Sequence, residues 1–260
     1  MKAVFFDIDG TLWDNHTNIP ESTKEAIKKL KENGHLSFIC SGRTRSFISA
    51  PKLLNLGFDG IVAGCGTYIE EHGKEIFYKN LKKSEIEKAL QIFHMHHLPV
   101  VMEGKNAMYL DEAEFSDKNY IARMKQQMGE KLKPITGNED RWEVSKFTCN
   151  ISSGEFEQVK EKLKDEYEIL VHDLPVAEFV PIGFSKASGI KKTCELLKIN
   201  REDTYAFGDS VNDLDMLRYV PHGVAMGNGS KAAKEAAEYV TGDIHADGIY
   251  HGLAHYGLIS

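Results

Sequence analysis

Apolar positions in the first third of the chain alternate between strand and helix spacing. Residues 4–8 are almost entirely apolar, which is typical of a strand buried on both faces of a sheet. A helix is expected from residue 21 to residues 33–34, opened by a capping box of Ser22 and Glu25. Further buried strands are expected at 36–40 and 60–63, and a hairpin at 68–78. Alternating strands and helices predict right-handed crossovers and a parallel sheet.

The middle third of the chain changes to paired strands with helices between them. A second capping box, Ser84 with Glu87, opens one of these helices. Strands are expected at 100–103, 107–110, 143–151 and 168–172, and helices at 84–94, 120–128 and 155–163. The pattern predicts an α+β insert of roughly a hundred residues, which is an ordinary domain size.

The strict α/β rhythm returns near residue 185. Helices are expected from residue 186 and at 230–237, and strands at 204–207 and 223–226. We therefore predict an α/β fold with a Rossmann-like parallel-sheet core that is split in sequence. The core takes residues 1–82 and 183–260, and the inserted α+β domain takes residues 83–182.

Two carboxylates, Asp7 and Asp9, stand at the end of the first apolar run. The chain leaves the strand at Gly10, so both acids can face one cleft at the carboxyl end of the strand, where open α/β sheets bind ligands. One carboxylate alone would suit a metal, whereas two suit a nucleophile and a proton carrier. The alternative is a solvated turn at the strand end with no chemical role.

Two other predicted strands also end in polar residues. Ser41 and the amide of Gly42 follow the second strand, and residues 208–213 follow the fourth core strand. Because the carboxyl ends of parallel strands share an edge, we expect these groups to converge with the first acids. Carboxylates without a nearby histidine or cysteine cluster suit a hard cation, above all Mg²⁺. With Lys186 at a helix start, the set describes a phosphoryl-transfer site.

Charge and composition exclude some classes of partner. The formal net charge is −7 and no basic stripe is present, which argues against nucleic acid. No segment approaches the roughly eighteen apolar residues of a membrane span, and early carboxylates interrupt the only stretch that could be a signal peptide. The four cysteines lie far apart in sequence and are expected to be reduced thiols. We expect a cytoplasmic protein, and the sequence leaves its oligomeric state open.

Four motifs resemble those of the haloacid dehalogenase superfamily, in the same order. They are DIDGT at 7–11, SGR at 41–43, SKASGI at 185–190 and GDSVNDLDM at 208–216. The large insert between the second and third motifs is similar to that of the Cof-like sugar-phosphatase branch. The resemblance spans almost the whole chain, and it implies that the insert is a cap whose inner face selects the substrate.

The resemblance also implies a role for each acid. Asp7 is expected to be the nucleophile that forms an aspartyl-phosphate, and Asp9 the group that protonates the leaving alcohol and then activates water. Mg²⁺ is expected to be held by the Asp7 carboxylate, the backbone carbonyl of Asp9, and Asp209. A useful acid at position 9 must then turn its side chain away from the metal.

Phosphate binding is implied for a second set of groups: Ser41, Gly42, Lys186 and Asn212. Asp213 is expected to orient Lys186 or the water shell of the metal. Arg43 could contact the substrate or pair with a surface acid, and both readings stay open. Trp13 departs from the branch, where an aliphatic residue is more usual at this position.

The sequence therefore predicts a Mg²⁺-dependent phosphatase that hydrolyses small phosphomonoesters. Sugar phosphates are the first expected substrate class, followed by phosphorylated cofactors such as flavin mononucleotide or pyridoxal phosphate. One alternative is a phosphomutase, which returns the phosphoryl group to the substrate. Another is a non-catalytic sensor of phosphate ligands on the same fold. The physiological substrate cannot be read from one chain.

Overall fold

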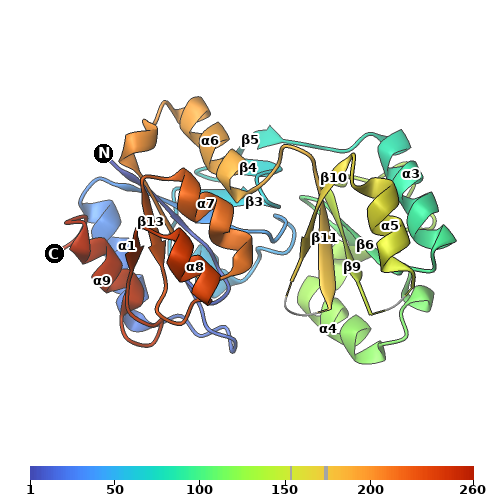
Figure 1. Cartoon of the computed structure of the whole chain (residues 1–260), viewed down its shortest axis with the longest axis horizontal. Coiled ribbons are helices and arrows are strands. Elements are labelled where there is room, and N and C mark those ends of the chain that lie inside the picture. The colour runs from blue at the N-terminus through green and yellow to red at the C-terminus, as the bar shows by residue number, and fades with distance from the viewer. Residues whose placement is uncertain (153, 173–174) are drawn as a thin grey trace. The chain divides into compact units, whose positions relative to one another are not determined.

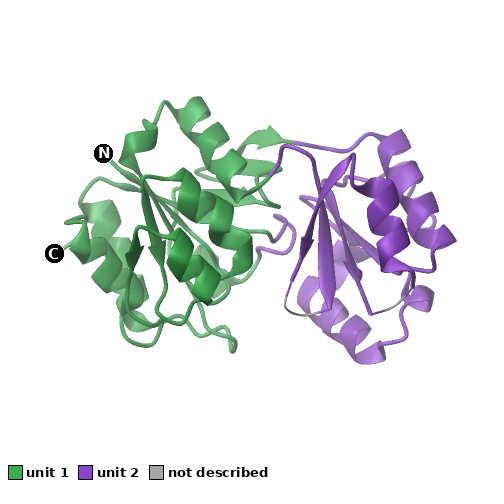
Figure 2. Ribbon diagram, viewed as in Figure 1, with its two compact units in different colours: residues 1–42, 49–78, 185–260 green, residues 43–48, 79–184 purple. Residues whose placement is uncertain are grey.

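The chain divides into two compact units (Figure 2). The computed structural model describes residues 1–152, 154–172 and 175–260. The first unit comprises residues 1–42, 49–78 and 185–260, and the second comprises residues 43–48 and 79–184. The units change within four residues of the boundaries proposed from the sequence, 82–83 and 182–183. Each unit is described by itself below.

Residues 43–48 belong to the second unit, although the sequence placed them in the core. Two of their hydroxyls explain this membership. Thr44 donates a hydrogen bond of 3.1 Å to Glu103, and Ser46 donates one of 2.7 Å to the carbonyl of Gly104. Both partners lie in the second unit, and all three side chains that take part are buried. Such long-range contacts leave no periodic signal in the sequence.

The first unit is built on an eight-stranded sheet in the order β14-β13-β12-β1-β2-β3-β4-β5 (Figure 1). Its strands are β1 (Ala3–Phe6), β2 (Leu36–Cys40), β3 (Gly60–Ala63), β4 (Tyr68–Glu71), β5 (Lys74–Tyr78), β12 (Thr204–Gly208), β13 (His222–Ala225) and β14 (Tyr239–Val240). The six strands from β14 to β3 are parallel, and β4 and β5 add an antiparallel hairpin. The central strands are buried along their length, as expected for strands covered by helices on both faces.

Helices cover this sheet through apolar side chains that alternate along each strand. They are α1 (Glu21–Glu32), α2 (Pro51–Leu54), α6 (Lys186–Leu197), α7 (Leu214–Tyr219), α8 (Lys231–Ala236) and α9 (Gly248–His255), with 3₁₀ turns η3 (Arg201–Asp203) and η4 (Val211–Asp213). One face packs Phe5 and Phe38 against Ile190 of α6 and Met216 of α7. Side chains of neighbouring positions point to the opposite face, where α9 approaches Phe207 at Gly252.

The second unit has a six-stranded sheet in the order β10-β11-β9-β6-β7-β8. Its strands are β6 (Val100–Glu103), β7 (Met108–Tyr109), β8 (Leu132–Lys133), β9 (Lys146–Asn150), β10 (Tyr167–Val171) and β11 (Val176–Pro181). Its helices are α3 (Lys83–Met95), α4 (Lys118–Met128) and α5 (Phe156–Leu163), with 3₁₀ turns η1 (Glu112–Glu114) and η2 (Gly129–Lys131). Figure 1 shows α3 and α5 together on one side of this sheet and α4 on the other.

The two faces of this second sheet differ in chemistry because its strands alternate. Phe147 and Cys149 of β9 point into the apolar core beneath α3 and α5. Lys146 and Thr148 occupy the intervening positions and so face the other way. This face carries polar and apolar side chains together, since Val101 and Met108 line the same cavity as Lys146 and Thr148.

Both capping boxes expected from the sequence are wrong in detail. Helix α1 begins at Glu21 after Pro20, and the Ser22 hydroxyl is buried without a hydrogen-bond partner. Helix α3 begins at Lys83, and Glu85 accepts a 2.6 Å bond from the backbone N–H of Lys82. Each helix starts one residue ahead of the serine, since proline and extended backbone at the preceding position already set the entry angle.

Across the described part of the chain, every helix is too short or too polar to cross a membrane.

Candidate active site

The first two acids of the site follow adjacent parallel strands. Asp7 comes directly after β1, and its backbone N–H donates a 2.9 Å hydrogen bond to the carbonyl of Phe207 in β12. Asp209 comes directly after β12, whose Phe207 is the register partner of Phe6. Residues about 200 positions apart in sequence therefore meet at one edge of the sheet, as the parallel topology predicts.

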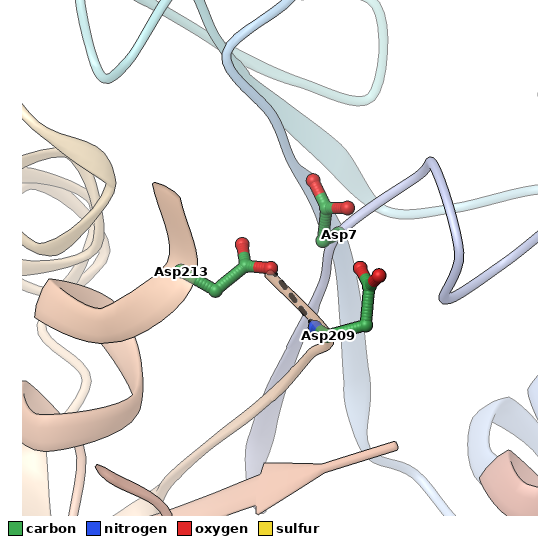
Figure 3. A group of neighbouring side chains, drawn as sticks. All are labelled: Asp7, Asp209 and Asp213. Carbon is green, nitrogen blue, oxygen red and sulfur yellow. Dashed lines mark hydrogen bonds between the residues drawn. The ribbon is translucent and has the colours of Figure 1, made fainter. Parts of the chain in front are cut away.

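Three carboxylates converge at this edge (Figure 3). One oxygen from each of Asp7, Asp209 and Asp213 lies within 4.8 Å of the others. Asp7 and Asp213 are buried, and Asp209 is half-buried. Oxygen donors at this spacing suit a hard divalent cation, so the residues fit the Mg²⁺ that the sequence predicted.

Lys186 supplies the positive charge beside these acids. We call Lys186, Asp7, Asp209 and Asp213 the core cluster. Lys186 is the first residue of α6, and its side chain is 1% exposed. Its ammonium donates hydrogen bonds of 2.6 Å to Asp7 and 2.5 Å to Asp213. One lysine against three carboxylates leaves an excess of negative charge, which a divalent cation would offset.

The pKa values of the cluster reflect this crowding. Burial, reinforced by the charge of Asp213, raises the pKa of Asp7 well above its ordinary value, although Lys186 opposes the shift. Burial would lower the pKa of Lys186, but the charges of Asp213 and Asp7 outweigh it and raise that pKa. Burial, with Asp213 close by, raises the pKa of Asp209 to about 7. The three carboxylates are thus costly to hold together in their charged form with Lys186 as their positive charge, unless a further cation binds.

Asp213 joins the lysine to the loop that carries Asp209. One of its oxygens accepts the Lys186 bond, and the other accepts backbone N–H bonds of 2.9 Å from Asp209 and 3.0 Å from Ser210. This carboxylate is fully buried. Asp213 therefore contacts Lys186, and its role in orienting that lysine stays a prediction.

Gly10 allows Asp209 to approach the first loop. Its φ is +79°, and a Cβ at this position would lie 2.3 Å from an oxygen of Asp209. Both the left-handed backbone and the close carboxylate therefore require glycine. Thr11 extends the contact, since its hydroxyl lies 3.4 Å from Asp209.

Asp9 points to a different partner from the other acids. Its carboxylate is exposed and accepts a 2.9 Å bond from the indole N–H of Trp13. It is not part of the group formed by Asp7, Asp209 and Asp213. This placement agrees with a side chain turned away from a metal, while the metal role proposed for its backbone carbonyl stays a prediction.

The predicted phosphate-binding groups lie at the ends of β2 and β12. Ser41 is buried and follows β2, which pairs with β1, and its N–H donates a 2.9 Å bond to the carbonyl of Val62. Gly42 comes next in the chain. Asn212 is half-buried in η4 and accepts a 2.6 Å bond from the Ser210 hydroxyl. Their contacts with phosphate stay predictions.

Arg43 belongs to the second unit, and its guanidinium lies 4.6 Å from the centre of the Phe47 ring. Both residues line a cavity of about 630 Å³ within that unit. Lys146, Thr148 and Glu178 line the same cavity from strands of the sheet.

A second buried lysine, Lys146, stands in this cavity wall. Its ammonium lies 2.5 Å from Glu178 and 3.7 Å from Glu103, and we call these three residues the cap cluster. Glu178 also lies 3.0 Å from the imidazole of His172. The sequence did not predict this cluster, because its members are spread over three strands with no shared spacing.

Asn228 contacts the loop that follows Asp9, and the sequence did not predict this contact. Its amide N–H donates a 2.8 Å bond to the carbonyl of Gly10, and its amide oxygen accepts a 2.9 Å bond from the backbone N–H of Ile244. It therefore connects the loop after Asp9 to the C-terminal part of the chain. The Gly-Asn-Gly sequence at 227–229 is typical of a turn, and nothing in it identifies the partner loops.

Comparisons with known proteins show the family of this chain. The family model for haloacid dehalogenase-like hydrolases matches residues 4–253. A Bacillus subtilis (strain 168) protein named "Putative phosphatase YkrA" is 33% identical, over 99% of this chain and 98% of its own length. A protein of the same strain named 5-amino-6-(5-phospho-D-ribitylamino)uracil phosphatase YwtE is 26% identical, over 96% of each chain.

Solved structures extend the likeness to the whole fold. The sugar phosphatase BT4131, described as HAD subclass IIB, aligns with a TM-score of 0.81 and 28% identity over 100% of both chains. A Geobacillus kaustophilus protein aligns with a TM-score of 0.83 and 30% identity over 99% of both chains. Both units of the structure are thus found together in these proteins.

Proposed function

Because this chain belongs to the haloacid dehalogenase-like hydrolases and is a phosphatase, we propose that it hydrolyses small phosphomonoesters with Mg²⁺ through an aspartyl-phosphate. The observation that carries the proposal is the core cluster. Asp7 lies beside Lys186 and near Asp209 at the carboxyl edge of the sheet. A carboxylate held between a lysine and a metal site can attack phosphorus while the charges of the phosphoryl oxygens are neutralised.

The first step transfers the phosphoryl group to the protein. Asp7 binds Lys186 through Oδ1, and we assign the attack on phosphorus to Oδ2. The new bond joins this oxygen to phosphorus as the bond between phosphorus and the leaving oxygen breaks. Asp9 donates its proton to the leaving alkoxide, so that a neutral alcohol departs.

The second step releases phosphate and regenerates the protein. Asp9, now a carboxylate, accepts a proton from water as that water attacks the phosphorus of the aspartyl-phosphate. The bond to Asp7 breaks and inorganic phosphate leaves. Lys186, the Ser41 hydroxyl, the Gly42 amide and Asn212 are the groups we assign to the phosphoryl oxygens.

Mg²⁺ is the cation we assign to Asp7, Asp209 and the carbonyl of Asp9. When bound, it would neutralise phosphate charge and orient the ester for in-line attack. Asp213 would keep Lys186 and the Asp209 backbone in place through its two oxygens.

The leaving group is assigned to the second unit, the cap. Its cavity of about 630 Å³ has both charged and apolar walls, which suits a small metabolite with polar groups. Arg43 is part of that wall and directly follows Gly42 in the chain. Sugar phosphates are the first candidates and phosphorylated cofactors the second. The name of BT4131, a sugar phosphatase, supports the first class. The name of YwtE describes a phosphate ester on a ribityl chain, which is also a small phosphomonoester.

The test is release of inorganic phosphate from a panel of sugar phosphates, flavin mononucleotide, pyridoxal phosphate and p-nitrophenyl phosphate, with and without MgCl₂. We expect release that requires the cation and is lost in Asp7→Asn. Asp203→Asn is the matched control, since Asp203 is an acid of the same unit that pairs with Lys2 at the surface. Equal activity of the two variants would contradict the assignment of the nucleophile.

The same assay separates the alternatives. A phosphomutase would convert one phosphate ester to its isomer and release little phosphate. A sensor would bind esters without changing them. Either result with the wild-type protein would overturn the proposed hydrolysis.

A further inference from the structure

The loop between Asp9 and Trp13 is closed by a dense set of local bonds. The backbone N–H groups of Leu12 and Trp13 donate to the carbonyl of Ile8 at 3.0 and 3.1 Å. The N–H of Gly10 in turn donates to the carbonyl of Trp13 at 2.9 Å. The loop therefore holds the backbone of Trp13 against that of Asp9, where the two form a bridge.

The Trp13 side chain also contacts Asp9. Its indole N–H donates a 2.9 Å hydrogen bond to the Asp9 carboxylate, and the residue is 4% exposed. The ammonium of Lys52 lies 5.7 Å from the centre of the indole ring, where it attracts the ring face. A buried ring fixed on several sides is a rigid donor for a carboxylate that is itself exposed.

Asp9 needs such a partner for a physical reason. It stands two residues from Asp7, and a divalent cation at the core cluster would attract its carboxylate. A carboxylate that coordinates the cation cannot carry a proton to the leaving group. In the structure Asp9 lies outside the group of three converging acids and bonds to Trp13 instead.

We propose that Trp13 is a positioning residue, which holds Oδ1 of Asp9 so that Oδ2 delivers the proton to the leaving alcohol. This inference rests on the proposed function, and it adds a role for a residue that departs from the branch. Trp13 acts through Asp9 and does not touch the reacting atoms. Without the indole N–H, we expect Asp9 to spend less time in the orientation that proton transfer needs.

The prediction is a change in leaving-group dependence. The leaving oxygen of an alkyl phosphate needs a proton. The leaving group of p-nitrophenyl phosphate is the stable p-nitrophenolate ion, which needs a proton far less. The value of kcat/KM covers the steps up to the aspartyl-phosphate, so it isolates the acid role of Asp9 from its later role as base. A merely structural defect would lower kcat/KM for both esters equally.

The experiment compares Trp13→Phe with Trp142→Phe, the same substitution at the other tryptophan of the chain. Trp142 lies in the second unit and donates its indole N–H to the carbonyl of Ile135. We expect Trp13→Phe to lower kcat/KM for the alkyl ester by about ten- to a hundredfold more than for p-nitrophenyl phosphate. Trp142→Phe is expected to leave this ratio unchanged.

An equal loss for both esters in Trp13→Phe would overturn the proposal while leaving the phosphatase function intact. Failure of the wild-type protein to release phosphate from either ester would instead overturn the proposed function. The two failures are therefore distinguishable.

A spectroscopic readout covers the case in which Trp13→Phe does not fold. The Trp142→Phe protein has Trp13 as its single tryptophan, so its fluorescence reports the Asp9 contact directly. Adding Asp9→Asn to that protein should change the emission intensity or maximum, since an amide replaces the carboxylate at the indole N–H. Unchanged emission would show that the contact is not made in solution and would overturn the proposal.

Discussion

Each of the two units buries one lysine between two carboxylates, and the outcome differs. In the core cluster Lys186 contacts Asp7 and Asp213, and in the cap cluster Lys146 contacts Glu178 and Glu103. Both lysines are 1% exposed. Both units therefore offset the burial of a lysine charge with two carboxylates.

The difference lies in the partners of the carboxylates. In the cap cluster Glu103 also accepts hydrogen bonds from the hydroxyls of Thr44 and Thr148, and Glu178 lies beside His172. In the core cluster a third acid, Asp209, adds negative charge. The cap cluster is satisfied by protein groups, whereas the core cluster has the charge and oxygen donors for a cation. We therefore expect a divalent cation at the core cluster and none at the cap cluster.

The largest effect is expected from a single change in each cluster. Asp7→Asn removes the proposed nucleophile and should lower kcat by about 10⁵-fold or more. Glu178→Gln acts on the cap cavity, so it should lower kcat/KM by about ten- to a hundredfold, mainly through KM. Steady-state phosphate release measures both. A larger effect on kcat from Glu178→Gln than from Asp7→Asn would contradict the assignment of the nucleophile to the core cluster.

Removing each lysine should separate the clusters by their response to cation. Lys186→Met and Lys146→Met each leave buried acids unpaired, which costs about 3–5 kcal/mol of unfolding free energy. MgCl₂ should restore part of that loss in Lys186→Met, because the cation supplies the missing positive charge. MgCl₂ should restore none of the lost unfolding free energy in Lys146→Met. Urea unfolding at fixed pH with and without MgCl₂ measures this, and equal restoration in both variants would contradict the account.

Acid should act on the cap cluster through Glu178. Burial alone would raise its pKa, but Lys146 and His172 outweigh burial and lower the pKa to about 2 from an ordinary value of 4.5. The unfolded chain then binds more protons than the native state between these values, so stability falls as pH drops from about 4.5 to about 2. Glu178→Gln should flatten this part of the pH dependence in urea unfolding. An unchanged acid limb would show that Glu178 is not the group responsible.

The pKa of Glu103 is shifted in the opposite direction from that of Glu178, so Glu103 serves as the control. Burial raises its pKa despite Lys146 and its hydroxyl partners. The native state then binds more protons than the unfolded chain above pH 4.5, so its contribution falls as pH rises. In Glu103→Gln this loss is absent. The change in the free energy of unfolding from pH 4.5 to pH 7 should therefore be more favourable in the variant than in the wild type. A less favourable change would contradict the direction of this pKa shift.

The sequence predicted what depends on strand order and local pattern. Asp7 and Asp209 could be placed together because each follows a buried parallel strand, and such strands end at one edge. Lys186 could be placed at a helix start by the residues around it. Capping residues were assigned less well, since Ser22 fits the pattern of a cap but Pro20 already begins the turn.

Contacts without a periodic signal could not be predicted. The bond from Trp13 to Asp9 depends on how one short loop closes, and the one from Asn228 to Gly10 joins distant segments. Thr44 joins the second unit through Glu103, although Gly42, two residues earlier, belongs to the first. Each of these contacts is set by tertiary packing, which a single sequence does not show.

The most direct measurement is a calorimetric titration of MgCl₂ into the wild-type protein, Asp209→Asn and Glu103→Gln. We expect saturable binding to the wild type and to Glu103→Gln, and loss of that binding in Asp209→Asn. Binding that survives in Asp209→Asn but disappears in Glu103→Gln would place the cation in the second unit and contradict a cation site at the core cluster.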